Sequence, residues 1–153
     1  MTDTRALILV DHGSRRGASN EMFEAFVQAF RAGDEFVVVE PAHMELAEPT
    51  IGDAYDRCVA AGATTVVVCP YFLLPGRHWD QDIPMLTAEA AQRHPGTRFL
   101  VSAPIGLHPL MQDVITSRVD ECIAHADGSR DACALCAGTD KCALRDAGWM
   151  PAE

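Results

Sequence analysis

A short apolar run in the middle of the chain constrains the fold more than any other feature. Residues 65–69 read TVVVC and are rich in β-branched side chains. Such a run is typical of a strand that is buried on both faces of a parallel sheet. Pro70, Pro75 and Gly76 then end the strand and prevent a helix from starting at once. The sequence therefore predicts an α/β fold built around this strand.

Three further strands and four helices alternate with this strand along the chain. Apolar runs predict the strands at residues 5–10, 35–40 and 97–103, and helical spacing of apolar residues predicts helices at about 20–33, 49–61, 84–93 and 110–125. Strands that alternate with helices in this way form parallel sheets with right-handed crossovers. We expect one four-stranded parallel sheet with helices on both faces in a domain of residues 1–126. A cysteine-rich tail, 127–153, follows it.

The charge of the chain excludes two classes of partner. Its 153 residues include 12 basic and 22 acidic side chains, which give a net charge of −10. This balance argues against a nucleic acid or an anionic membrane as the partner. No apolar run reaches the length of a membrane span. The first ten residues, MTDTRALILV, enter the first strand almost immediately and leave no room for a targeting segment, so we expect a cytoplasmic protein.

Side chains suited to binding metals follow each predicted strand. In open α/β sheets, ligands bind at the carboxyl ends of the strands, and these ends share one edge. His78 is followed four residues later by Asp82, so one helical turn places both on the same face. The residues expected at this edge are His12, His43, Glu45, His78 and His108.

Imidazole is both a ligand for divalent transition metals and a base near neutral pH. We predict that His12 and His78 bind a metal and accept protons, although either residue is also compatible with a turn histidine that bonds to the backbone. Glu45 is predicted as a further metal ligand, with a helix-capping role as the alternative. His43 is predicted to line a substrate pocket. His108 has a weaker claim to contact metal.

Three arginines accompany these histidines in an otherwise acidic protein. Arg15 and Arg16 follow His12, and Arg77 precedes His78. Because guanidinium pairs with carboxylate through two hydrogen bonds, the three arginines predict an anionic ligand. The alternative is ordinary ion pairing with Asp80 or Asp82. The sequence contains neither a P-loop nor a GxGxxG pattern, so it gives no support to nucleotide binding.

Four cysteines are concentrated toward the C-terminus. Cys133 and Cys136 form a CxxC pair, Cys142 follows after five residues, and Cys122 lies upstream. Four thiolates suit either an iron–sulfur cluster or a structural zinc ion. The spacing matches no common zinc ribbon, which usually pairs two CxxC knuckles, and therefore favours the cluster. In a reducing compartment, disulfides are the less favoured interpretation.

Several long segments, in the same order, resemble one known family. They are LVDHGSRR (9–16), VEPAHMELAEPTI (39–51), PYFLLPGRHWDQDIP (70–84), LTAEAA (86–91) and CALCAGTDKCAL (133–144). The chain resembles the short, single-module class II chelatases of tetrapyrrole synthesis, and above all the plant-type sirohydrochlorin ferrochelatases. The short cobaltochelatases share the DHGSR and PGRH segments, whereas the cysteine tail is typical of the ferrochelatase branch.

The resemblance implies a chelatase-like fold, half of a flavodoxin-like pair of modules, and therefore a homodimer. It also implies ATP-independent insertion of Fe2+ into sirohydrochlorin to give sirohaem, with His12 and His78 in metal delivery and proton removal. By the same resemblance, Cys133, Cys136 and Cys142 hold a [2Fe–2S] cluster, with Cys122 or a cysteine of a second subunit as the fourth ligand. Arg15, Arg16, Arg77 and His43 would contact the macrocycle, and Trp79 or Phe72 its apolar face.

Other functions stay open at this point. Co2+ or Ni2+ insertion belongs to the same class, because nitrogen ligands bind these ions at least as tightly as Fe2+. A carrier that binds the metal or macrocycle without turnover, and a redox sensor built on the cysteine tail, belong to different classes. The sequence leaves undecided which metal is used in the cell and what the cluster does.

Overall fold

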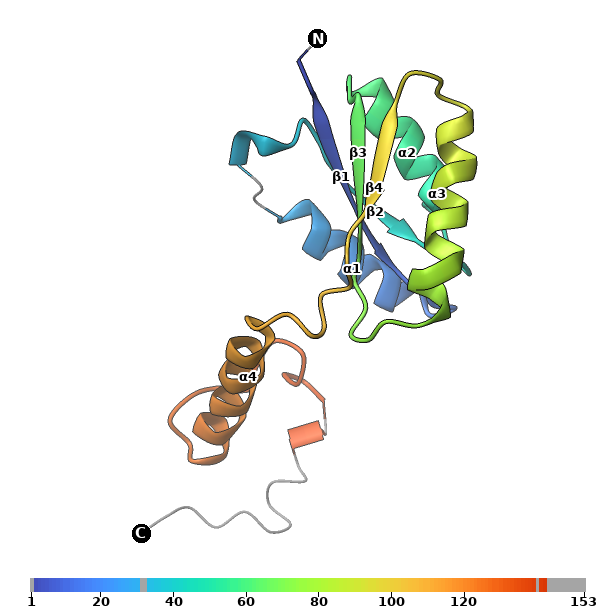
Figure 1. Cartoon of the computed structure of the whole chain (residues 1–153). Helices are drawn as coiled ribbons and strands as arrows, with labels where there is room; N and C mark the ends of the chain where they lie inside the picture. Colours follow the sequence, from blue (N-terminus) through green and yellow to red (C-terminus); the bar gives the residue numbers. More distant parts are fainter. Residues whose placement is uncertain (1, 31–32, 140, 143–153) are drawn as a thin grey trace. The chain divides into compact units, whose positions relative to one another are not determined.

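The structure is a computed structural model that describes residues 2–30, 33–139 and 141–142. The chain forms two compact units, Met1–Leu107 and His108–Glu153. The first unit contains the sheet and three helices, and the second contains one helix and the cysteine segment (Figure 1). Helix 110–125 of the prediction therefore groups with the tail. The predicted domain boundary at residue 126 stays a prediction.

The first unit is built on four parallel strands. They are β1 (Arg5–Asp11), β2 (Val39–His43), β3 (Thr65–Pro70) and β4 (Arg98–Val101), in the spatial order β2-β1-β3-β4. β1 pairs with β2 and β3, and β3 pairs with β4, all in parallel. All four carboxyl ends therefore lie at one edge of the sheet, and the predicted α/β class is confirmed.

Helices cover both faces of this sheet, because consecutive side chains of a strand point to opposite sides. Ile8 and Val10 of β1 pack with residues of α2 (Ile51–Ala60) and α3 (Ile83–Gln92). Leu7 and Leu9 pack instead against Phe23 and Val27 of α1 (Gly17–Gln28), which lies on the other face in Figure 1. Burying a side chain of this size contributes about 1.5–3 kcal/mol. This two-sided core makes β1 a rigid support for the loop that follows it.

The second strand begins later than predicted. The apolar pattern places it at 35–40, whereas β2 spans Val39–His43 and Gly33–Glu35 form a single 3₁₀ turn. Pro41, which reads as a strand terminator, lies inside β2. It is tolerated because β2 is an edge strand, where a missing N–H breaks no ladder bond on the open side. His43 is therefore the last residue of the strand and not part of the loop.

The second unit contains α4 (Met111–Ala126), in the position predicted for the last helix. None of its residues is buried. No helix in the described parts of the chain has the length and hydropathy that a membrane crossing requires.

A polar cluster joins α2 to the end of α3 and leads to a pH-dependent prediction. Asp56 accepts hydrogen bonds from His94, at 2.6 Å, and from Arg93, at 2.9 Å. These two bonds, with that of His94 the larger cause, hold the pKa of Asp56 below its ordinary value. The carboxylate therefore stabilises the fold above about pH 4, and this contribution is lost as the pH falls through the lowered pKa.

We expect Asp56→Asn to reduce the free energy of unfolding at pH 7 by less than about 1 kcal/mol, because the carboxylate is half exposed and screened by solvent. The deficit should shrink as the pH falls below 4. Urea titrations of both proteins at several pH values measure it. A deficit that does not change with pH would show that the loss is one of packing rather than charge.

Candidate functional site

Three loops bring His12, Glu45 and His78 together at the carboxyl edge of the sheet. These loops follow β1, β2 and β3, which are neighbours in the sheet. His12 Nε2 lies 2.9 Å from Glu45 Oε1, and the His12 and His78 ring centroids are 5.1 Å apart at an interplanar angle of 67°. All three side chains are about half exposed and therefore reachable by a ligand. The expected juxtaposition is thus present, whereas the roles assigned to these residues stay predictions.

The contact between His12 and Glu45 requires a shared proton. An imidazole nitrogen and a carboxylate oxygen at 2.9 Å attract each other only if one of them carries hydrogen. A divalent cation that binds between two such atoms replaces the proton, because both atoms are metal ligands. The pair is therefore able to exchange a proton for a metal ion.

His78 has a carboxylate of its own. Its Nδ1 lies 2.8 Å from Asp82 Oδ2 within the π-helical turn His78–Asp82, as the four-residue spacing predicts. An ionised carboxylate only accepts hydrogen bonds, so Nδ1 is the protonated nitrogen and Nε2 has a free lone pair. Single π-helical turns are often found at functional sites. Asp82 therefore orients His78 and determines which ring nitrogen is available.

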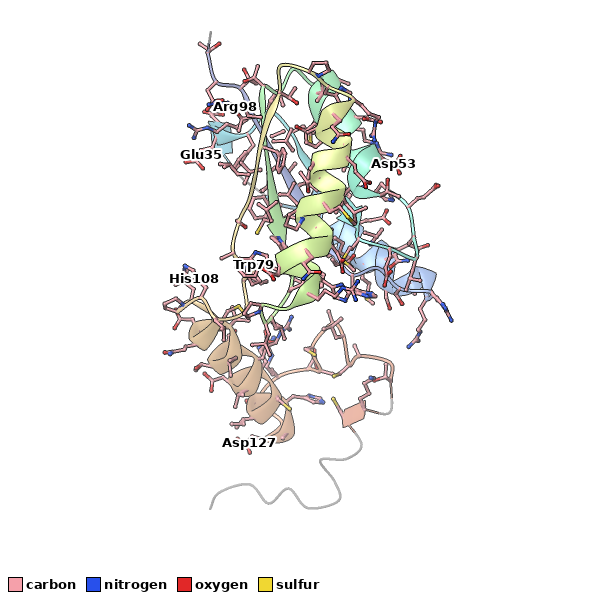
Figure 2. The ribbon with its side chains drawn as sticks, turned by 45° about the vertical axis from the view of Figure 1, so that its right-hand side comes forward. Glu35, Asp53, Trp79, Arg98, His108 and Asp127 are labelled. Atoms are coloured by element: carbon pink, nitrogen blue, oxygen red, sulfur yellow. The ribbon has the colours of Figure 1, made fainter. Side chains whose placement is uncertain are left out.

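Trp79 anchors this turn to the end of β4. Its indole N–H donates a hydrogen bond of 2.8 Å to the carbonyl oxygen of Ser102, and Figure 2 shows Trp79 beside the chain that leaves β4. Phe72 lies against His78, with ring centroids 6.2 Å apart. Phe72 and Trp79 were predicted to touch a macrocycle, and both contribute to the surroundings of His78.

His43 lies where the sequence did not place it. Its side chain is fully buried, and its two ring nitrogens contact Asp11 Oδ1 at 2.6 Å and Glu24 Oε1 at 3.1 Å. Burial lowers the pKa of His43, but the hydrogen bonds and charges of Glu24 and Asp11 outweigh it and raise the pKa above 6.5. In this structure His43 has no exposed surface with which to contact a substrate, contrary to the expectation. His43 is buried because β2, which includes Pro41, extends as far as this residue.

The three arginines of the prediction are exposed. Arg15 and Arg16 lie in the loop after β1. The Nε of Arg77 lies 3.8 Å from Asp82 Oδ1, so the alternative of ion pairing describes part of its environment. The guanidinium is nevertheless accessible, since 78% of the Arg77 side chain is exposed.

The cysteines of the second unit contact one another. The Cys136 thiol hydrogen bonds with both Cys133 and Cys142, and the bond with Cys133 is the larger cause that raises the pKa of Cys136 to about 11. Backbone N–H groups of Cys136 and Leu135 lower the pKa of Cys133. Cys122 is exposed.

The described residues do not form a ready-made metal site. Among residues 2–30, 33–139 and 141–142, no three His, Cys, Asp or Glu side chains are grouped so as to hold a metal ion. His108 belongs to the second unit, where its Nδ1 accepts a hydrogen bond of 3.2 Å from the N–H of Leu110. The site of the first unit is thus the pair His12–Glu45 with His78 beside it.

Sequence reasoning missed three residues of this site: Asp11, Glu24 and Gly13. Asp11 directly precedes His12, and that adjacency is the signal that was available. Glu24 lies in α1, on a helix face that the sequence describes only as amphipathic. Gly13 has a φ of +85°, and a Cβ at this position would overlap the carbonyl oxygen of Glu45.

Comparisons with known proteins identify the family of this chain. The CbiX family model matches residues 6–122. This chain belongs to the CbiX family. Over 142 residues, 93% of the chain, it is 53% identical to the sirohydrochlorin ferrochelatase, chloroplastic, of Arabidopsis thaliana, of which it covers 63%. The chain thus spans less than two thirds of the length of this relative.

Two solved structures share the fold of this CbiX protein. The first is the sirohydrochlorin chelatase SirB from Bacillus subtilis subspecies spizizenii in complex with cobalt. Its TM-score is 0.70 at 34% identity, covering 76% of this chain and 50% of that one. The second is the putative cobalamin biosynthesis CbiX protein from Marinobacter aquaeolei VT8. Its TM-score is 0.66 at 29% identity, with coverage of 79% and 98%. The predicted family and fold are confirmed.

A second glycine, Gly106, allows the loop after β4 to pack closely against the loop that leads from β3 to His78 in this CbiX protein. Gly106 donates its N–H to the carbonyl oxygen of Phe72 at 3.1 Å, and a Cβ on Gly106 would overlap the backbone of Leu73. We expect Gly106→Ala to lower the free energy of unfolding by about 1–3 kcal/mol, because one of the two loops has to move. Gly76→Ala is the matched control, since its Cβ meets nothing within 4 Å. Chemical denaturation measures both, and equal losses would contradict the expectation.

Proposed function

We propose that this protein inserts Fe2+ into sirohydrochlorin to give sirohaem, without ATP. The observation that carries the proposal is the pairing of two neighbouring histidines with two carboxylates, His12 with Glu45 and His78 with Asp82, at the ligand-binding edge of a CbiX fold. The names of the relatives support the same substrate and reaction class.

The reaction requires the exchange of one cation for two protons. As Fe2+ enters the macrocycle, two pyrrole N–H protons have to leave. His12 and His78 accept them, and Glu45 and Asp82 stabilise the resulting imidazolium groups through their hydrogen bonds. Fe2+ is first held between His12 and Glu45, where it displaces their shared proton. The metal is therefore a substrate. When it passes into the macrocycle, it leaves His12 and Glu45 without their shared proton, and this pair is then able to accept a pyrrole proton.

Arginines orient the macrocycle over this site. Sirohydrochlorin carries carboxylates around its rim, and Arg15, Arg16 and Arg77 are exposed beside the histidines. Their guanidinium groups bind the rim carboxylates and compensate for the net negative charge of the protein.

An anaerobic turnover assay tests the proposal. Purified protein is mixed with sirohydrochlorin and Fe2+, then separately with Co2+, and the absorption of the macrocycle is followed. With Fe2+, we expect the concentration of sirohaem formed to exceed the protein concentration many times. Tight binding of the macrocycle without a rate above the uncatalysed control would instead identify a carrier. Faster turnover with Co2+ would favour a cobaltochelatase, an alternative supported by the cobalt complex of SirB.

The cysteine segment fits a [2Fe–2S] cluster in its donor chemistry. Cys133, Cys136 and Cys142 carry soft thiol ligands, and Cys136 contacts each of the other two. Cys122 or a cysteine of a second subunit supplies the fourth ligand. A bound cluster supplies one-electron redox chemistry, and no step of metal insertion passes through it. Truncation after Ala126 should therefore remove the visible absorption of the cluster and retain insertion. Loss of function on truncation would favour the redox sensor.

Two further features belong to this proposal. A single module with one sheet is expected to work as a homodimer, which sedimentation at assay concentration tests; a fully active monomer would contradict it. A cytoplasmic location is proposed as well, and fractionation of cells tests it, because the Arabidopsis relative is named as chloroplastic.

A further inference from the structure

His43 is a buried polar residue that the proposed reaction does not use. None of its side chain is exposed, yet both ring nitrogens have carboxylate partners, Asp11 of β1 and Glu24 of α1. The Phe23 ring of α1 lies against it, with centroids 5.9 Å apart. Burying such a group costs free energy unless every polar atom is paired. A pairing that spans three elements at the base of the site therefore calls for an explanation.

Asp11 connects His43 to the loop that carries His12. The same oxygen, Oδ1, that contacts His43 also accepts a hydrogen bond of 2.9 Å from the N–H of Gly13. Asp11 and Gly13 flank His12 in the chain. The Asp11 carboxylate therefore fixes the backbone on either side of His12, and His43 holds this carboxylate in place.

Backbone bonds transmit this position to Glu45. The N–H of Met44 donates to the carbonyl oxygen of Asp11 at 2.8 Å, and the N–H of Glu45 donates to that of His12 at 3.1 Å. The loops after β1 and β2 are therefore joined directly above His43. A shift of the Asp11 carboxylate moves both members of the His12–Glu45 pair.

Helix α1 fixes the far end of the same loop. The Asn20 side chain accepts from the N–H of Ser14 at 2.9 Å and donates to its carbonyl oxygen at 2.8 Å. The helix was predicted to begin at about residue 20, but α1 begins at Gly17, so Asn20 lies inside its first turns and makes this contact. Asn20 and Glu24 are one turn apart, so one face of α1 reaches both Ser14 and His43.

We infer that His43 is a positioning residue for the His12–Glu45 pair, which acts by holding the Asp11 carboxylate against the N–H of Gly13. Its bond to Glu24 stabilises the burial of the ring and does not orient His12. The effect on metal insertion rests on the proposed function, whereas the effect on the position of His12 does not.

Two substitutions separate the two bonds of His43. In His43→Asn, the amide nitrogen occupies the place of Nδ1 and is able to donate to Asp11. In His43→Gln, the longer side chain places its amide near Nε2, where it reaches Glu24 but not Asp11. Glu24→Gln is the matched control, because its amide oxygen still accepts from Nε2 while the Asp11 contact is untouched.

The first readout is the NMR spectrum of the His12 ring in the metal-free protein. We expect unchanged resonances in His43→Asn and Glu24→Gln and shifted resonances in His43→Gln. If His43→Gln does not fold, Asp11→Ala removes the carboxylate itself, and with it both the contact with His43 and the hydrogen bond from the N–H of Gly13, so its His12 resonances should shift. Unchanged His12 resonances in every folded variant that breaks the contact would overturn the inference, as would equal shifts in His43→Asn and His43→Gln.

The second readout is catalysis. Loss of such a supporting contact typically costs 10–100-fold in activity or metal affinity, so we expect kcat of His43→Gln to fall by about that factor. KM for the macrocycle should not change, because a buried side chain does not touch it. His43→Asn should retain kcat within about threefold. If the wild-type protein inserts no metal, the proposed function fails, while the NMR result still decides the role of His43.

Discussion

Replacing Gly13 with alanine should lower the rate of metal insertion by about 100-fold or more, because the change displaces His12 from Glu45. Gly13 has a φ of +85°, which costs an L-residue about 1–2 kcal/mol. Its added Cβ would also overlap the carbonyl oxygen of Glu45 and lie 3.2 Å from the His43 Cβ. A displacement of 1 Å at a reacting group is enough for a loss of this size.

The matched control is Gly17→Ala. A Cβ on Gly17 meets no atom within 4 Å, and this glycine does not have a positive φ. We expect that variant to insert iron at the wild-type rate. The measurement is kcat and KM for both variants, with thermal unfolding to show that Gly13→Ala remains folded at the assay temperature. Wild-type kcat in a folded Gly13→Ala protein would contradict the expectation. It would mean that metal insertion does not require the close contact between the loops that carry His12 and Glu45.

The sheet and its active edge were predictable because they depend on local patterns. Apolar runs such as 65–69 identify strands, and strands that alternate with helices have to pair in parallel. Parallel pairing then places the residues after each strand at a common edge, which is why His12, Glu45 and His78 were expected together. The same rule does not say whether the side chain of the last residue of a strand is buried or exposed to solvent.

His43 shows why the remainder was not predictable. It was assigned to a loop because Pro41 precedes it, and only the edge position of β2 explains how that proline fits into a strand. Its partners Asp11 and Glu24 are 32 and 19 residues away in sequence. Contacts of this kind depend on the packing of α1 against the sheet, and helical spacing does not specify that packing. The sequence therefore predicts the exposed residues proposed to react more readily than the buried residues that contact them.

Substitution of the two exposed histidines should have the largest effect on catalysis. We expect His12→Ala and His78→Ala each to reduce kcat by about 10²–10⁴-fold, the usual contribution of a general base. Both variants should keep the wild-type fold, because each side chain is about half exposed and neither is part of the core. Anaerobic steady-state assays measure the loss. His94→Ala is the control, because the side chain of His94 contacts Asp56 and the Tyr55 ring rather than His12 or His78.

The double variant distinguishes a shared step from two separate steps. The two rings are 5.1 Å apart, and each has its own carboxylate. In the proposed reaction they would therefore act on the same metal ion and the same macrocycle. Residues that act as a unit give losses that do not multiply. We therefore expect His12→Ala with His78→Ala to be about as slow as the slower single variant. Losses that multiply would assign the two histidines to independent steps, with one delivering the metal and the other removing protons.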